Sequence, residues 1–263
     1  MSGSADLLGS ELPPPAPVAA QALAHNGRMK PWPALCILTL TLLSQAALAA
    51  PAAPAKVEDS IAQRAQACTL CHGKQGRAAA DGYYPRLAGK PQGYLYKQLL
   101  NFRDGRRHYG LMSDLLDPLS DAYLQELAAY FAGLELPYPP AQTPSLPAAA
   151  LARGRQLVLH GDAARKLPAC VQCHGEQLTG VQPFIPGLLS LPRDYLNGQM
   201  GAWRSGQRQA VAPDCMAQIA KTLKEDEINA ISQWLASQAL PPGAKPAQAL
   251  PAALPLDCGG LKP

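Results

Sequence analysis

The pentapeptide Cys68-Thr69-Leu70-Cys71-His72 recurs later in the chain as Cys170-Val171-Gln172-Cys173-His174. Two cysteines separated by two residues and followed at once by histidine form the attachment pattern of c-type haem. Each thiol adds to a haem vinyl group and becomes a thioether, and the adjacent imidazole can take one axial position on the iron. We therefore predict two covalent haem c groups, with the iron ligands His72 and His174 and the attachment residues Cys68, Cys71, Cys170 and Cys173.

Two other kinds of site also use paired cysteines. A Cys-x-x-Cys pair can be a redox disulfide or half of a zinc site. A zinc site would need both pairs in one cluster and would leave His72 and His174 as bystanders. A redox disulfide would not need a histidine after each pair. Haem attachment explains both histidines and is the favoured interpretation.

The N-terminal region indicates export. We expect no fold in residues 1–28, an Ala- and Pro-rich leader. An apolar run from Leu35 to Ala49 follows and ends in the small-x-small cleavage pattern Ala47-Leu48-Ala49. We interpret residues 29–49 as a signal peptide and Met29 as the true start. A transmembrane anchor is the alternative, but the run falls short of the roughly 20 residues that a span needs.

Export would place the cysteines in an oxidising compartment. Of the 7 cysteines, four belong to the two motifs and Cys36 lies in the signal peptide. The remaining two, Cys215 and Cys258, are predicted to form a disulfide that ties the tail to the second domain. Two unpaired thiols are the alternative. The chain-entropy model credits a loop of this length with roughly 4 kcal/mol of stabilisation.

The surroundings of the motif are also repeated, which indicates an internal duplication. We predict a first domain at residues 57–137, a proline-rich linker at 138–150, a second domain at 151–240 and a Pro-rich tail at 241–263. The repeated residues include Pro85 and Pro186, Tyr94 and Tyr195, Gln98 and Gln199, Phe102 and Trp203, and Met112 and Met216.

The net charge of the chain is +4, and nothing in the sequence resembles a nucleic-acid-binding surface.

Three main helices are predicted in each half, and no stretch shows alternating strand patterning of useful length. In the third helix of the first half, Leu124, Leu127 and Phe131 recur at amphipathic spacing. The predicted fold class is all-α, with two tandem haem domains. The expected helices are Ser60–Ala67, Gln92–Arg103, Ser120–Ala132, Leu151–His160, Arg193–Trp203 and Lys224–Ser237.

Met112 and Met216 are the candidates for the sixth iron ligand. They occupy equivalent repeat positions, and we expect each in a loop just before the last helix of its half. Thioether sulfur is soft, which favours Fe(II) and raises the reduction potential. The rival residues are His108, interpreted as an exposed loop histidine, His160, interpreted as a helix end, and Met200, interpreted as core.

The basic turns admit three interpretations. Their arginines could pair with haem propionates, form a docking face or be ordinary solvated residues. The arginines concerned are Arg103, Arg106, Arg107, Arg204 and Arg208.

In each half the order Cys-x-x-Cys-His-Gly, Pro-x-Leu, a Tyr–Gln helix, Met and a final apolar helix resembles class I cytochrome c. Two such units in an exported chain resemble the dihaem cytochromes of the c4 type, over about residues 57–240. The resemblance implies an all-helical haem domain in each half, with ligand pairs His72–Met112 and His174–Met216. It also implies that the carbonyls of Pro85 and Pro186 accept the second proton of each proximal imidazole.

The second half departs from this pattern in two places. Asp214-Cys215 precedes its methionine where the first half has Gly110-Leu111. The tail beyond Leu240 lies outside the matched region.

We predict an electron-transfer protein rather than an enzyme, because protein ligands would fill both axial positions of each iron. The expected location is the periplasm, with peripheral membrane association allowed. The expected donor is a quinol-oxidising complex or a dehydrogenase, and the expected acceptor is a terminal oxidase. One alternative is a cytochrome subunit of a larger dehydrogenase or oxidase complex. Another is a dihaem peroxidase, which would need an open iron position and an acid/base group that no motif nominates.

Overall fold

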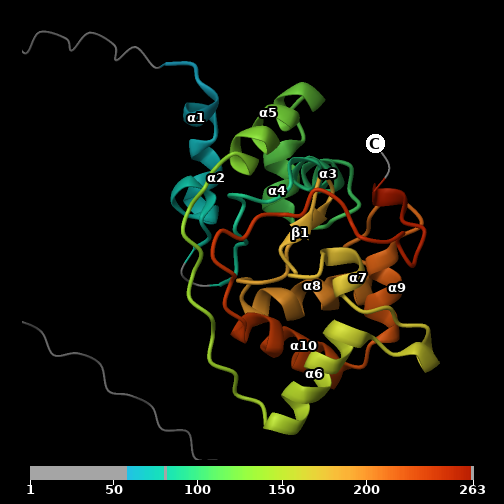
Figure 1. The fold of residues 1–263 in the computed structure, drawn as a ribbon. Helices are drawn as coiled ribbons and strands as arrows, with labels where there is room; N and C mark the ends of the chain where they lie inside the picture. The colour runs from blue at the N-terminus through green and yellow to red at the C-terminus, as the bar shows by residue number, and fades with distance from the viewer. Residues whose placement is uncertain (1–57, 80–81, 262–263) are drawn as a thin grey trace, which may run out of the picture. The chain divides into compact units, whose positions relative to one another are not determined.

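The repeat seen in the sequence forms two groups of helices (Figure 1). The computed structural model describes residues 58–79 and 82–261, so the predicted leader and signal peptide lie outside the described residues. The described residues belong to one unit by their contacts. The boundaries of the two haem domains therefore stay predictions.

The first half contains the three predicted helices. The segment Gln92–Arg103 is helical with the predicted bounds, whereas the expected helix at Ser60–Ala67 is interrupted at Ala65 and continues to His72. Ser60 and Ser120 act as N-caps, because each hydroxyl accepts a hydrogen bond from a backbone N–H three residues later at 3.3 Å. The elements are α1 (Ile61–Arg64), α2 (Gln66–His72), η1 (Lys74–Gly76), α3 (Gln92–Arg103), α4 (Gly110–Leu116) and α5 (Asp121–Ala132).

The second half repeats this order. Its first helix begins at Ala148 rather than at Leu151, because Pro147 is followed by three alanines, the best helix formers. The interval between α5 and this helix therefore ends at Pro147. The elements are α6 (Ala148–His160), η2 (Ala163–Arg165), α7 (Val171–His174), α8 (Arg193–Ser205), α9 (Cys215–Thr222), α10 (Glu225–Ser237) and η3 (Gly259–Leu261).

Two short strands depart from the all-helical expectation. Strands β1 (Gly180–Val181) and β2 (Ile185–Pro186) pair antiparallel, and Ala247 of the tail bridges to Val181. Strands of two residues are too short to show alternation in a sequence. Among residues 58–79 and 82–261, no helix has the length and apolar character that a bilayer span requires.

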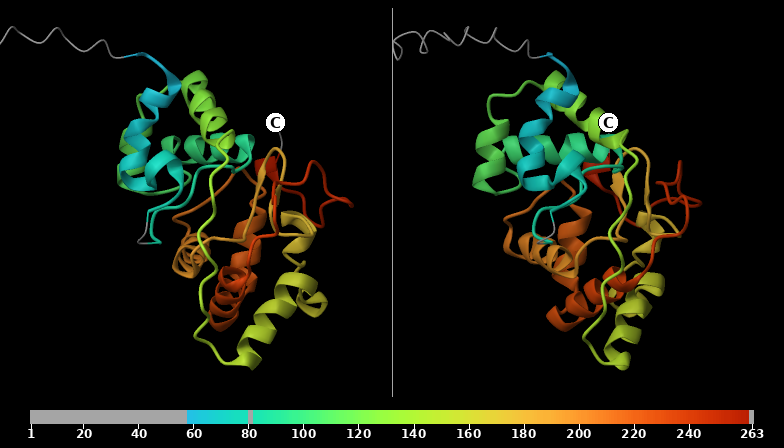
Figure 2. Two further views of the ribbon diagram at one scale, coloured as in Figure 1. Left: turned by 60° about the vertical axis from the view of Figure 1, so that its left-hand side comes forward. Right: turned by 90° about the vertical axis from the view of Figure 1, so that its left-hand side faces the viewer.

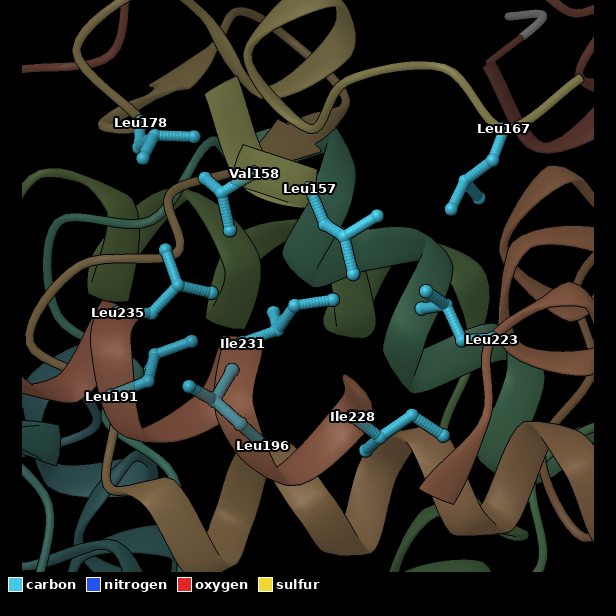
Figure 3. Close-up of a cluster of buried hydrophobic side chains, with 10 residues drawn as sticks. All are labelled: Leu157, Val158, Leu167, Leu178, Leu191, Leu196, Leu223, Ile228, Ile231 and Leu235. Carbon is cyan, nitrogen blue, oxygen red and sulfur yellow. The ribbon is translucent and has the colours of Figure 1, made fainter. Parts of the chain in front are cut away.

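Each half has its own apolar core. In the first half, Phe131 and Leu127 of α5 pack in one cluster with Leu95, and Leu124 packs in another with Phe102. The larger core of the second half lies between α6, α8 and α10 (Figure 3). Its buried members are Leu157, Val158, Leu167, Leu178, Leu191, Leu196, Leu223, Ile228, Ile231 and Leu235.

The linker and the tail both return to the second half. In both views of Figure 2 the linker runs in extended form from α5 to α6. The backbone N–H of Gln142 donates to the carbonyl of Ala236 at 2.8 Å, and that of Ser145 to the buried side chain of Gln233 at 2.7 Å. The predicted disulfide between Cys215 and Cys258 is confirmed, with Cα atoms 5.4 Å apart.

A buried carboxylate ties α10 to α6 and to η2. Glu227 receives hydrogen bonds from Arg165 and Arg153 at 2.8 Å, and these contacts lower the pKa of its carboxyl group to about 2. The folded pKa lies below the value near 4.5 of the unfolded chain. The stabilisation is therefore complete above pH ~4.5 and is lost as the pH falls towards 2.

We expect Glu227→Gln to lower the free energy of unfolding at neutral pH by about 2–3 kcal/mol, discounted for the partial exposure of Arg153. Glu225→Gln on the same helix is the matched control, because its carboxylate is exposed and makes only a 3.8 Å ion pair with Arg204. Thermal unfolding followed by circular dichroism at pH 7 and pH 3 measures both variants. Equal melting of the two at pH 7 would contradict this role for Glu227.

Candidate haem sites

Both cysteine motifs lie at the ends of short helices. Cys68 and Cys71 lie in α2, while Cys170 caps α7 and Cys173 lies within it. Each helix ends at a glycine with positive φ, and a Cβ on Gly73 would lie only 2.2 Å from the carbonyl oxygen of Ala78. The chain can therefore turn away directly after each histidine. All four thiols are unpaired.

The two histidines are buried, with 7% of His72 and 8% of His174 exposed. The Nδ1 atom of each lies 2.8 Å from a proline carbonyl, Pro85 for His72 and Pro186 for His174, as predicted. A carbonyl only accepts, so Nδ1 carries the proton and Nε2 keeps a free lone pair. Burial lowers the pKa of both imidazoles, which favours the neutral form that a metal needs.

The thiols do not form a zinc centre. The described residues contain no group of three or more His, Cys, Asp or Glu side chains placed to hold a metal ion. Burial raises the pKa of the Cys170 thiol to about 12, and it also raises the pKa of Cys68 and Cys173. The zinc interpretation therefore finds no support.

The candidate sixth ligands are in helices, not in the loops that we expected. Met112 is the third residue of α4 and Met216 is the second residue of α9. Both helices have eight residues or fewer, too short to reveal a reliable period in the sequence. Both side chains are partly buried, and the helices that carry them are separate from those that carry the histidines.

The rival ligands behave as predicted. His108 and His160 are exposed, and His160 is the last residue of α6. Met200 packs against the apolar core of the second half. The two histidines lack the buried setting of an iron ligand, and Met200 has the core contacts predicted for it.

Two of the basic residues are not solvated, contrary to one of our interpretations. Only 9% of Arg107 and 5% of Arg208 is exposed, and both guanidinium groups bond the same two amide oxygens, those of Gln98 and Gln199, at 2.6–3.0 Å. Gln98 and Arg107 belong to the first half, while Gln199 and Arg208 are their repeat equivalents. Sequence reasoning missed this network because buried arginines look like any other basic residue in a list.

The same network places each arginine over an aromatic ring. Arg107 lies 4.3 Å from the ring centroid of Phe102, and Arg208 lies 3.8 Å from that of Trp203. The other three arginines have ordinary partners. Arg103 and Arg106 pair with Asp104, and Arg204 bonds the carbonyl of Leu223.

The two buried arginines of this network have no negatively charged partner among the described residues. Among the described residues, neither Arg107 nor Arg208 forms an ion pair, and the buried indole N–H of Trp203 finds no hydrogen-bond acceptor. A buried cation needs a counter-charge, since desolvation costs several kcal/mol per ion. The carboxylates of haem propionates would meet this demand. The cysteine pairs, the free imidazole nitrogens and these donors together fit two covalent haems.

A cluster of tyrosines that no sequence motif indicates lies beside the first histidine. The ring of Tyr84 is 6.0 Å from that of His72, and its hydroxyl is 3.4 Å from the hydroxyl of Tyr109. The residue equivalent to Tyr84 in the second half is Ile185, which precedes Pro186. The two candidate haem sites therefore differ in the polarity of their surroundings.

Known proteins were compared with the chain, and no family model matches it. The chain is 34% identical to cytochrome c4 of Pseudomonas aeruginosa over 203 aligned residues. The alignment covers 76% of this chain and 94% of the relative. The chain belongs to the cytochrome c4 family. It is also 36% identical over 206 residues to a "Thiosulfate dehydrogenase electron acceptor" of Thiomonas intermedia, which covers 78% of this chain and 92% of the relative.

A solved cytochrome c4 supports the fold. The crystal structure of reduced recombinant cytochrome c4 from Pseudomonas stutzeri matches with a TM-score of 0.59 and 28% identity, over 68% of this chain and 97% of that one. As a cytochrome c4, the chain is a dihaem protein with two tandem class I cytochrome c folds and two covalently bound haem c groups. It transfers electrons and is not an enzyme, so the peroxidase alternative is wrong.

Proposed function

We propose that this cytochrome c4 is a periplasmic carrier that takes electrons from a dehydrogenase or a quinol-oxidising complex and delivers them to a terminal oxidase. The observation that supports it most strongly is the pair of buried histidines, each oriented by a proline carbonyl and each beside two unpaired thiols. The apolar run and cleavage pattern before residue 50 support export.

We assign the side chains in each half as follows. Cys68 and Cys71 would hold the first haem through thioethers, with His72 and Met112 as axial ligands. When bound, each haem iron would accept and release one electron at a time. If the same histidine and methionine stay bound in the oxidised and the reduced protein, the coordination of the iron does not change during electron transfer. The corresponding residues of the second half are Cys170, Cys173, His174 and Met216.

Arg107 and Arg208 would hold the haem propionates. Each is buried and lacks a carboxylate among the described residues, and Trp203 adds an unused N–H beside Arg208. Because both arginines bond both glutamines, a change of charge at one haem would be felt through this network at the other. This arrangement favours two carriers that respond to each other over two independent ones.

The donor that the comparisons favour is a thiosulfate dehydrogenase. The relative from Thiomonas intermedia, named as an electron acceptor for that enzyme, is 36% identical to this chain, slightly more than the cytochrome c4 of Pseudomonas aeruginosa at 34%. We infer that this chain receives electrons from an enzyme of the same class, either as a free carrier or as a cytochrome subunit of the complex.

This donor is tested with the oxidised dihaem protein, a thiosulfate dehydrogenase and thiosulfate. We expect the haem absorption bands to shift to the reduced form at a rate on the order of 10 s⁻¹, a typical enzyme turnover. A mixture without thiosulfate is the control and should stay oxidised. A second mixture contains a quinol-oxidising complex and its quinol in place of the dehydrogenase and thiosulfate. If only this second mixture reduced the protein, the thiosulfate dehydrogenase would not be the donor. If neither mixture reduced it, the carrier role would be overturned.

A further inference from the structure

The segments that precede the two candidate methionines are built differently. In the first half the chain reads Gly110-Leu111-Met112, and in the second half Asp214-Cys215-Met216. Cys215 is disulfide-bonded to Cys258, 43 residues further along the chain. The covalent link to the tail is thus one residue away from the candidate ligand.

The tail also packs against the loop that leads to Met216. The backbone N–H of Gly259 donates to the carbonyl of Pro213 at 3.0 Å. Gly259 is buried, and a Cβ at this position would lie 2.1 Å from the carbonyl oxygen of Ala212. Only glycine allows the tail to approach the loop this closely.

The loop is closed from its other side by Asp214. Its carboxylate accepts hydrogen bonds from the backbone N–H of Ala210 at 2.7 Å and of Ala217 at 3.0 Å. It therefore caps α9 and fixes the turn before it. The start of α9, with Met216, is held by a cap, a covalent bond and a buried backbone contact.

The first half has none of these three supports among its described residues. Tyr109, the N-cap of α4, makes no side-chain capping bond. Leu111, the equivalent of Cys215, is 67% exposed. The segment with Met112 is fastened by lighter contacts, in which the hydroxyl of Ser113 donates to the carbonyl of Phe102 at 3.1 Å and the hydroxyls of Tyr109 and Tyr84 lie 3.4 Å apart.

We propose that the C-terminal tail is a brace that positions Met216 on the second haem, whereas Met112 is held more weakly on the first. The inference rests on the ligand assignment of the proposed function. An external ligand can replace a methionine only if the segment that carries the methionine moves away. The disulfide and Gly259 restrict that movement, so the second haem resists substitution and the first haem accepts an external ligand more readily.

The test is a titration of the oxidised dihaem protein with imidazole, which competes for the sixth position. Loss of the methionine–iron charge-transfer band reports substitution. The shifted methionine methyl signals in the proton spectrum of the reduced protein count the methionine ligands, and Met112→His identifies the signal of the first haem. In the unaltered protein we expect two affinities, with imidazole binding at least tenfold more weakly at the second haem.

Cys215→Ala combined with Cys258→Ala removes the covalent part of the brace. We expect the imidazole affinity of the second haem to rise at least tenfold, which corresponds to about 1.4 kcal/mol. The affinity of the first haem should stay the same, and it serves as the internal control for folding. An unchanged affinity at the second haem would overturn the brace.

A second variant tests the packing with the disulfide intact. Gly259→Val would force the tail away from Ala212, whereas Gly260→Ala is a matched control because its new Cβ would meet the Cβ of Ala210 at an ordinary 3.6 Å. We expect only Gly259→Val to raise the imidazole affinity of the second haem. Equal affinities in these two variants would count against the brace.

The same measurements separate this inference from the proposed function. A single shifted methionine signal in the unaltered protein, lost in Met112→His, would show that Met216 is not a ligand, which overturns the ligand assignment and the brace together. Two signals with an unchanged affinity in the cysteine variant would overturn the brace alone.

Discussion

Replacing Cys170 and Cys173 together by serine should leave one covalent haem on the exported protein and melt the second half. Cys170 packs against the apolar cluster that includes Leu157 and Ile231, so the bound porphyrin would complete this core. Without the thioethers the haem would be lost, and the cluster would face an unfilled space. Loss of buried apolar contacts on this scale exceeds the usual stability of a small domain.

Mass spectrometry of the intact chain and far-ultraviolet circular dichroism measure this variant. We expect the mass to fall by one haem, the haem absorbance per chain to be halved and the helical signal to drop. The paired control replaces Cys68 and Cys71 by serine and should remove the other haem. A serine variant that still carries two covalent haems would contradict the assignment of Cys170 and Cys173.

The second large effect is expected at a sixth ligand. Met112→His should lower the reduction potential of the first haem by on the order of 0.2 V, a fraction of the roughly 0.8 V that axial ligation can span. Imidazole is a harder, more basic donor than thioether sulfur, so it stabilises Fe(III) relative to Fe(II). The second haem should change far less, since its own ligands are intact.

Potentiometric titration followed by absorption spectroscopy measures both haems of this variant. Met200→Leu is the control, because Met200 packs in the core of the second half and no iron contact is assigned to it. It should leave both potentials within a few tens of millivolts. If Met112→His and Met200→Leu gave the same two potentials as the unaltered chain, Met112 would not be the ligand.

The sequence was most informative about features that depend on residues close together in the chain or on the number of cysteines. The bounds of α3 follow from neighbouring residues and the disulfide from cysteine counting, and the structure confirms both. The bonds from the two histidines to Pro85 and Pro186 followed from the family resemblance, because each proline follows its haem motif at a short spacing that the two halves share.

The sequence was least informative where two distant segments meet. Arg107 and Arg208 lie 101 residues apart, and their burial becomes visible only once α3 and α8 place Gln98 and Gln199 between them. The helices around the candidate methionines were missed for another reason. Each has no more than eight residues, and α9 owes its start to the cap at Asp214.

The shared arginine–glutamine network has the exchange symmetry of a two-fold homodimer, in which each partner supplies the same pair of groups to the other. A molecule with one copy of the repeat could make the same contact with a second molecule, but only at sufficient concentration. Fusion through the proline-rich segment turns that bimolecular encounter into an intramolecular one, with an effective concentration in the millimolar range for short connections. The two halves therefore remain associated at any dilution.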